Sequence, residues 1–136
     1  MKNGLSLQFK FQRLTQSSIQ QLFSQSPQAR KLQNAIAQSD PSAPIKVRLK
    51  GLTGSSLSFV LSDAFQNSSR PFLLVFDDKE EAAYYLNDLE QLIGSKDVLF
   101  YPGSYRRPYQ IEETDNANVL LRAEVLNRIN SRKRPA

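Results

Sequence analysis

The residues best suited to chemistry lie in one short stretch, Gly51-Leu-Thr-Gly-Ser-Ser-Leu-Ser58. The alternating run before it, Ile45-Lys-Val-Arg-Leu-Lys50, predicts a strand, and residues 55–66 predict a helix. A glycine-bearing loop between a strand and a helix is the setting of a phosphate-binding loop for nucleotides. In such a loop, backbone N–H groups surround the phosphates, a lysine contacts the β and γ oxygens, and a hydroxyl helps to hold magnesium.

This stretch lacks the lysine. Ser56 and Leu57 stand where the motif has its last glycine and its lysine, and Ser58 alone keeps the hydroxyl. The change removes a charge-assisted contact to the phosphates. We therefore expect a turn that keeps the shape of a nucleotide site without its function, although a phosphate could still rest weakly on the helix N-terminus. No cofactor is expected at the loop residues, which are Gly51, Thr53, Gly54, Ser55, Ser56, Leu57 and Ser58.

An acidic pair, Asp77-Asp78, follows the apolar run Phe72-Leu-Leu-Val-Phe76. Acidic residues after a strand hold a metal ion in some NTPases. Here Glu80 lies three residues after Asp77, which is close to a capping box, and acids in a first helical turn are favoured by the helix dipole. Capping explains the pair better than metal binding, so we expect no metal site and no catalytic residue.

Aromatic and basic residues alternate in Tyr101-Pro-Gly-Ser-Tyr-Arg-Arg-Pro-Tyr109. Tyr105, Arg106, Arg107 and Tyr109 could stack on bases and contact phosphates, as in proteins that bind single-stranded nucleic acid. The alternative is a surface loop whose tyrosines pack on the domain edge and whose arginines are solvated. We favour this alternative, because base-stacking surfaces are usually more strongly basic.

The net charge of +5 is concentrated at the two ends of the chain. Residues 1–44 carry five basic side chains and one acidic, residues 45–131 carry ten and twelve, and residues 132–136 add three basic ones. The charge is therefore weak evidence for a basic binding face. The sequence has no cysteine and no histidine, so thiol chemistry and the commonest general base are absent. It also has no signal-peptide core and no apolar run of membrane-spanning length, and the cytoplasm is the expected compartment.

Residues 1–44 predict a helical preface and linker. The segment is rich in Gln and Ser and ends in a proline-containing stretch at 40–44. One short helix would be capped by Ser17 or Ser18, and a second would begin at Pro27, a residue suited to a first helical turn.

Residues 45–136 predict a partial α/β domain. Strands at 45–50, 72–76 and 98–101 alternate with helices at 55–66, after the acidic pair, and from about residue 116. This order predicts a parallel sheet flanked by helices, in the manner of a degenerate P-loop NTPase of the RecA or helicase type. Because the last helix leads into Ser-Arg-Lys-Arg-Pro without a following strand, we expect the domain to be truncated.

The order of motifs resembles the beginning of the bacterial transcription-repair coupling factors. The likeness covers nearly the whole chain, is strongest over 45–135, and is carried by four stretches: Gly51-Leu-Thr-Gly-Ser-Ser-Leu-Ser58, Asp78-Lys-Glu-Glu-Ala-Ala-Tyr-Tyr-Leu-Asn-Asp-Leu-Glu90, Val98-Leu-Phe-Tyr-Pro-Gly-Ser-Tyr105 and Asp115-Asn-Ala-Asn-Val-Leu-Leu-Arg-Ala-Glu-Val-Leu-Asn-Arg128.

The resemblance implies a non-catalytic role. The N-terminal module of that family is similar to UvrB, the helicase subunit of nucleotide excision repair, whose loop is intact. Gly51, Thr53 and Gly54 match that loop, whereas Ser56 and Leu57 depart from it, which implies a scaffold that does not use ATP. The whole family protein displaces stalled RNA polymerase and recruits UvrA. Its ATP- and Mg-dependent motor and its main UvrA-contacting domain would both lie beyond residue 136.

Two other functions remain open. A small NTPase with an aberrant loop would need Asp77 or Asp78 to hold magnesium. A nucleic-acid-binding module would use the aromatic and arginine residues of 101–109.

Overall fold

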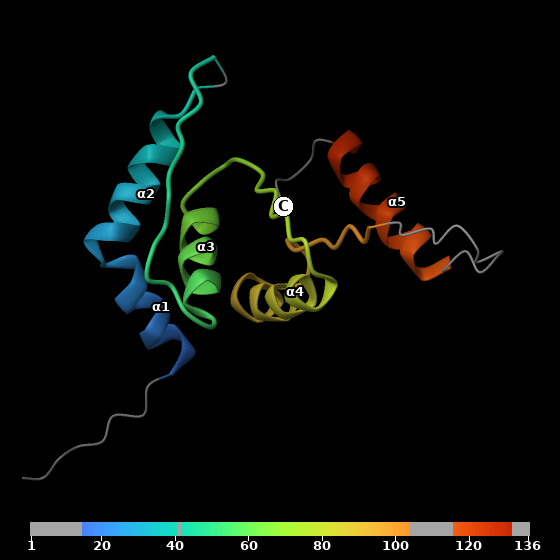
Figure 1. Ribbon diagram of the computed structural model, residues 1–136, viewed down its shortest axis with the longest axis horizontal. Helices are drawn as coiled ribbons and strands as arrows, with labels where there is room; N and C mark the ends of the chain where they lie inside the picture. Colours follow the sequence, from blue (N-terminus) through green and yellow to red (C-terminus); the bar gives the residue numbers. More distant parts are fainter. Residues whose placement is uncertain (1–14, 41, 104–115, 132–136) are drawn as a thin grey trace, which may run out of the picture.

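The computed structural model describes residues 15–40, 42–103 and 116–131, and the regular secondary structure of this part of the chain is helical (Figure 1). The helices are α1 (Gln16–Ser24), α2 (Pro27–Gln38), α3 (Ser56–Gln66), α4 (Lys79–Ile93) and α5 (Asn116–Ser131).

Local sequence signals explain where these helices begin. The Ser26 hydroxyl caps α2 by accepting a hydrogen bond from the Ala29 amide at 3.1 Å, and Pro27 occupies the first turn as predicted. Helix α1 is capped by Thr15, whose hydroxyl accepts from the Ser18 amide at 3.3 Å. The predicted cap at Ser17 or Ser18 was therefore wrong, because the helix begins earlier, at Gln16, and places both serines inside its first turn.

The predicted parallel sheet is absent from the described residues. Segments 45–50, 72–76 and 98–101 contain no strand, and the β-type pairing in this part of the chain is one isolated bridge between Asp40 and Ala43. The α/β expectation, including the P-loop NTPase architecture, is thus wrong for this structure.

The physical reason is that a helix takes the place of a neighbouring strand. Parallel strands pair only when their backbones lie about 4.8 Å apart. In Figure 1, segment 45–50 runs on the α2 side of α3, whereas segment 72–76 lies on the opposite side of that helix. Alternation of apolar residues along a segment does not supply a partner at that spacing.

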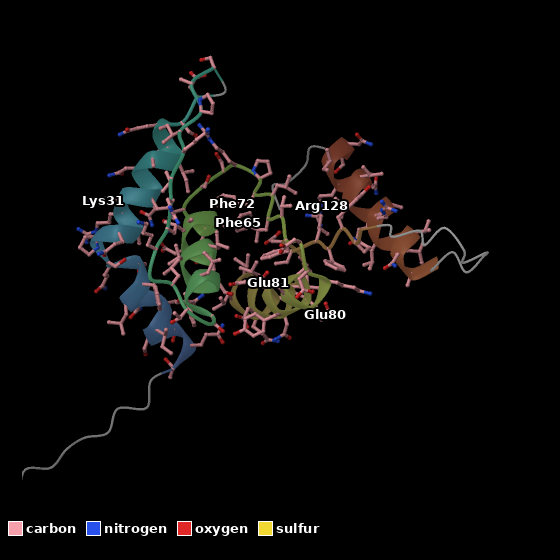
Figure 2. All side chains as sticks on the ribbon, viewed as in Figure 1. Lys31, Phe65, Phe72, Glu80, Glu81 and Arg128 are labelled. Atoms are coloured by element: carbon pink, nitrogen blue, oxygen red, sulfur yellow. The ribbon has the colours of Figure 1, made fainter. Side chains whose placement is uncertain are left out.

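Segment 72–76 is anchored to the helices through alternate residues. The Phe72 ring meets the Phe65 ring of α3 edge-on at 5.7 Å, as their adjacent labels in Figure 2 indicate. The Phe76 ring stacks on Tyr85 of α4 at 4.9 Å. Leu73, which lies between these anchors, is 87% exposed. Within this apolar run Phe72 and Phe76 are half-buried, whereas Leu73, Leu74 and Val75 are exposed.

Helix α3 is the centre of the packing. Its Phe59 ring stacks on Phe23 of α1 at 5.3 Å, which attaches the N-terminal helices to it. Ala64 of α3, Leu89 of α4 and Ala29 of α2 are the buried hydrophobic residues of the described part. The core is therefore small, and polar contacts between helices contribute to the packing.

Helix α5 is attached by its polar side chains. The Arg128 guanidinium donates to the Lys96 carbonyl at 3.0 Å, and the Arg122 guanidinium lies 5.0 Å from the centre of the Tyr101 ring. Several apolar residues of this helix are exposed. Those with more than half of their surface exposed are Val119, Leu120, Leu126 and Ile129.

Candidate functional site

The loop before α3 has the backbone shape that its glycines allow. Gly51 has φ 78° and Gly54 has φ 53°, both in the left-handed region that residues with a Cβ rarely adopt. These two turns bring the chain from the extended segment 45–50 into the first turn of α3. Both glycines therefore supply turns before α3, and among the described residues no strand precedes the loop.

The loop is closed by its own hydroxyl groups. The Ser56 hydroxyl accepts a hydrogen bond from the Thr53 amide at 2.7 Å and donates to the Thr53 carbonyl at 2.7 Å. In a working phosphate-binding loop, backbone amides of this kind point toward the phosphates. The Thr53 amide already has an internal acceptor, so a phosphate would have to displace the Ser56 hydroxyl to reach it.

Ser55, the residue just before α3, contacts the neighbouring helix α4. The hydroxyl groups of Ser55 and Tyr84 of α4 are 2.6 Å apart and share a hydrogen bond. Ser55 makes no side-chain cap to α3. Its side chain connects the loop to α4.

Ser58 is turned away from any position beside a nucleotide. It is fully buried, and its hydroxyl donates to the Asp88 carboxylate of α4 at 2.9 Å. In the intact motif the corresponding hydroxyl holds magnesium. Leu57, in the place of the lysine, is half-buried. The two side chains that would carry the phosphate chemistry are thus one apolar group and one structural hydroxyl.

The two residues of the acidic pair have different roles: Asp78 caps α4, and Asp77 is exposed to solvent. The Asp78 carboxylate accepts from the Glu80 amide at 2.9 Å at the start of α4. Hydrogen bonds from the Glu80 side chain and then from its backbone N–H lower the pKa of Asp78 from 3.8. Asp77 is exposed. The predicted capping role is confirmed for Asp78, and the described residues contain no group of three side chains able to hold a metal ion.

A buried carboxylate that the sequence analysis missed joins α2 to α3. Asp63 is 9% exposed, and its carboxylate accepts from the Gln33 amide group at 2.7 Å and from the Asn67 amide group at 3.2 Å. The signal was an aspartate inside the apolar helix run of residues 57–65. Like the contact between Ser58 and Asp88, this cluster connects two helices.

The aromatic and arginine residues predicted to contact nucleic acid, Tyr105, Arg106, Arg107 and Tyr109, lie outside the described residues. Tyr101, at the start of that segment, is 49% exposed and is covered on one face by Arg122. The nucleic-acid hypothesis therefore stays a prediction.

Comparison with known proteins finds no matching family model, no curated relative and no similar solved structure. Within the described part of the chain, no helix has the length and apolar character needed to cross a membrane.

Proposed function

We propose that this chain is a non-catalytic scaffold of a bacterial transcription-repair coupling factor. Its role is to support the surface that recruits UvrA and to restrain the ATP-driven motor of the whole protein, which acts on stalled RNA polymerase in the cytoplasm. The chain itself holds neither ATP nor magnesium. UvrA and RNA polymerase are partners of the whole protein rather than of this chain alone.

One observation carries the non-catalytic part of the proposal. Of the last three positions of the loop, only Ser58 keeps the residue type of the nucleotide-binding motif. Ser58 is fully buried, and its hydroxyl donates to Asp88 between α3 and α4. A metal ligand must be free to reach the metal and its phosphates. Freeing this hydroxyl would break a buried contact between two packed helices.

The family assignment rests on the set of sequence motifs, although the described residues lack the sheet that the resemblance implies. The loop supports it by keeping the positive φ angles of Gly51 and Gly54 while its functional positions carry Ser56 and Leu57. A loop with this backbone and without its lysine fits a former nucleotide site that now serves packing.

Phosphate release from Mg-ATP tests the competing NTPase function. The chain should release phosphate at the rate of buffer alone, and Ser58→Ala should leave that rate unchanged. A measurable release that disappears in Ser58→Ala would establish an NTPase instead, because it would give the hydroxyl a role at magnesium.

The reading frame that encodes the chain tests the family assignment. We expect it to continue past codon 136 into a UvrA-contacting domain and then an ATP-driven motor. A stop codon at that point, or downstream domains of another kind, would refute membership of a coupling factor while leaving the ATP result unaffected.

A further inference from the structure

Segment 45–50 is an exposed, extended stretch with two chemically distinct sets of side chains. Ile45, Val47 and Leu49 are 48%, 50% and 42% exposed, although they are apolar. The residues between them, Lys46, Arg48 and Lys50, are also exposed. Figure 1 shows the segment as an extended trace beside α2 and α3.

The backbone of this segment is available for pairing. In the described part of the chain, no hydrogen bond joins the N–H or C=O groups of residues 45–50 to another group. An extended backbone with a row of free donors and acceptors is a template for an added strand. Residues 45–50 therefore offer main-chain hydrogen bonds to an extended peptide.

The charges of the segment identify the peptide that fits. Along an extended chain, Lys46, Arg48 and Lys50 recur about every 6.7 Å on the same side. None of them makes a hydrogen bond or an ion pair within the described residues. Acidic side chains directly across from them on a paired strand would stabilise the pairing, and basic ones would destabilise it.

We propose that segment 45–50 binds an extended peptide in which acidic and apolar residues alternate. The peptide adds as a strand, its apolar side chains cover Val47 and Leu49, and its carboxylates meet Lys46, Arg48 and Lys50. This is recognition by β-strand addition, in which main-chain bonds supply affinity and alternate side chains supply specificity. Peptide binding at segment 45–50 does not depend on the nucleotide loop, so an experiment can refute the peptide site without refuting the scaffold function, and the reverse.

Segment 72–76 is the nearest rival surface. Leu73 and Val75 are 87% and 83% exposed, and within the described residues their backbone groups also have no hydrogen-bond partner. That segment carries no charge that would select one partner over another. It serves instead as the control surface in the test.

Fluorescence anisotropy with labelled peptides tests the proposal. The probe is a peptide of three Val-Glu repeats flanked by Gly-Ser, and the comparison peptide has Lys in place of each Glu. We expect saturable binding of the Glu peptide and at least tenfold weaker binding of the Lys peptide. A Glu peptide with alternate backbone amides N-methylated keeps its charge but cannot pair, and it should also bind at least tenfold more weakly.

Matched variants locate the site. The triple change Lys46→Glu, Arg48→Glu and Lys50→Glu should exchange the preference, so that the Lys peptide binds and the Glu peptide does not. An equal change of charge on other exposed basic residues, Arg30→Glu, Lys31→Glu and Lys79→Glu, should leave the preference unaltered.

Three results would overturn the proposal. The first is equal binding of the N-methylated and unmodified Glu peptides, which would mean simple charge attraction. The second is loss of binding in a Leu73→Ser, Val75→Ser variant with binding retained in the 46–50 triple variant, which would place the site on segment 72–76. The third is tighter binding of a single-stranded oligonucleotide than of the Glu peptide at the same salt concentration, which would indicate a nucleic-acid surface.

Discussion

Removing the Ser58 hydroxyl should loosen the contact between α3 and α4. Ser58 is fully buried and donates at 2.9 Å to the Asp88 carboxylate, which has no other hydrogen-bond donor among the described residues. A hydrogen bond to a charged group contributes about 1.5–3 kcal/mol. Asp88 is only half-buried, so water partly replaces the lost donor. We therefore expect Ser58→Ala to lower the free energy of unfolding by about 1.5 kcal/mol.

Two assays measure this change. Hydrogen exchange of the α3 and α4 amides should become roughly tenfold faster, since about 1.4 kcal/mol corresponds to a factor of ten when exchange follows local opening. The midpoint of thermal unfolding, followed by circular dichroism, should fall by roughly 6 °C.

Ser62 provides a matched control on the same helix. It is 1% exposed, but its hydroxyl donates to the Phe59 carbonyl of its own helix at 2.9 Å, so Ser62→Ala should change stability little. In a double-mutant cycle, Asp88→Ala should remove most of the effect of Ser58→Ala. If Ser58→Ala changes stability as little as Ser62→Ala in both assays, the hydrogen bond from Ser58 to Asp88 does not stabilise the packing of α3 on α4.

Three further predictions concern the loop and the helix caps. Gly54→Ala should lower the free energy of unfolding, measured in urea, by about 1 kcal/mol, because the φ of Gly54 is +53° even though no atom would clash with an added Cβ. Gly54→Asn should lower it less, because asparagine tolerates a positive φ better; equal losses would contradict an origin in the backbone conformation. Ser26→Ala should lower stability by about 1 kcal/mol and reduce helicity, because the Ala29 amide loses its acceptor; unchanged ellipticity would argue against the cap. The pKa of Asp78 is lowered in the folded chain, so the contribution of this carboxylate to stability is present above the ordinary pKa of 3.8 and is lost as pH falls through the folded-state pKa. Between roughly pH 5 and pH 2, the midpoint of thermal unfolding should therefore fall less for Asp78→Asn than for the unmodified chain.

The helices could be predicted because their signals are local. Pro27, Asp78 and Gly94 each mark an end of a helix through backbone geometry that depends on a few neighbouring residues. The weakest case was α1, where the start of the helix offers three hydroxyl residues, Thr15, Ser17 and Ser18, and Thr15 was not considered as the cap.

The sheet could not be predicted because strand pairing is a contact between distant segments. The alternation of residues 45–50 specifies an apolar side and a basic side, but it does not say whether a strand or a helix covers the apolar side. In the structure, α3 lies between this segment and 72–76, and neither segment finds a partner strand (Figure 1). The apolar residues of α5 show the same limit, because Val119, Leu120, Leu126 and Ile129 are apolar and yet more than half exposed.

The state of the loop was predictable in part. The missing lysine is visible in the sequence and indicates lost function. The new partner of Ser58 is not visible there, because Asp88 lies thirty residues away and reaches it only when α3 packs on α4. The burial of Asp63 had a sequence signal in its apolar neighbours, but its partners Gln33 and Asn67 become evident only from the packed helices.

A titration of the isotope-labelled chain with Mg-ATP, followed through the backbone N–H signals of Gly51 and Gly54, tests the central claim most directly. We predict no saturable shift of either signal up to about 5 mM nucleotide, because the Thr53 amide and the Ser58 hydroxyl already have partners inside the protein. Shifts at both glycines that saturate below about 100 µM, and that require magnesium, would show that the loop still seats a triphosphate and would contradict the account.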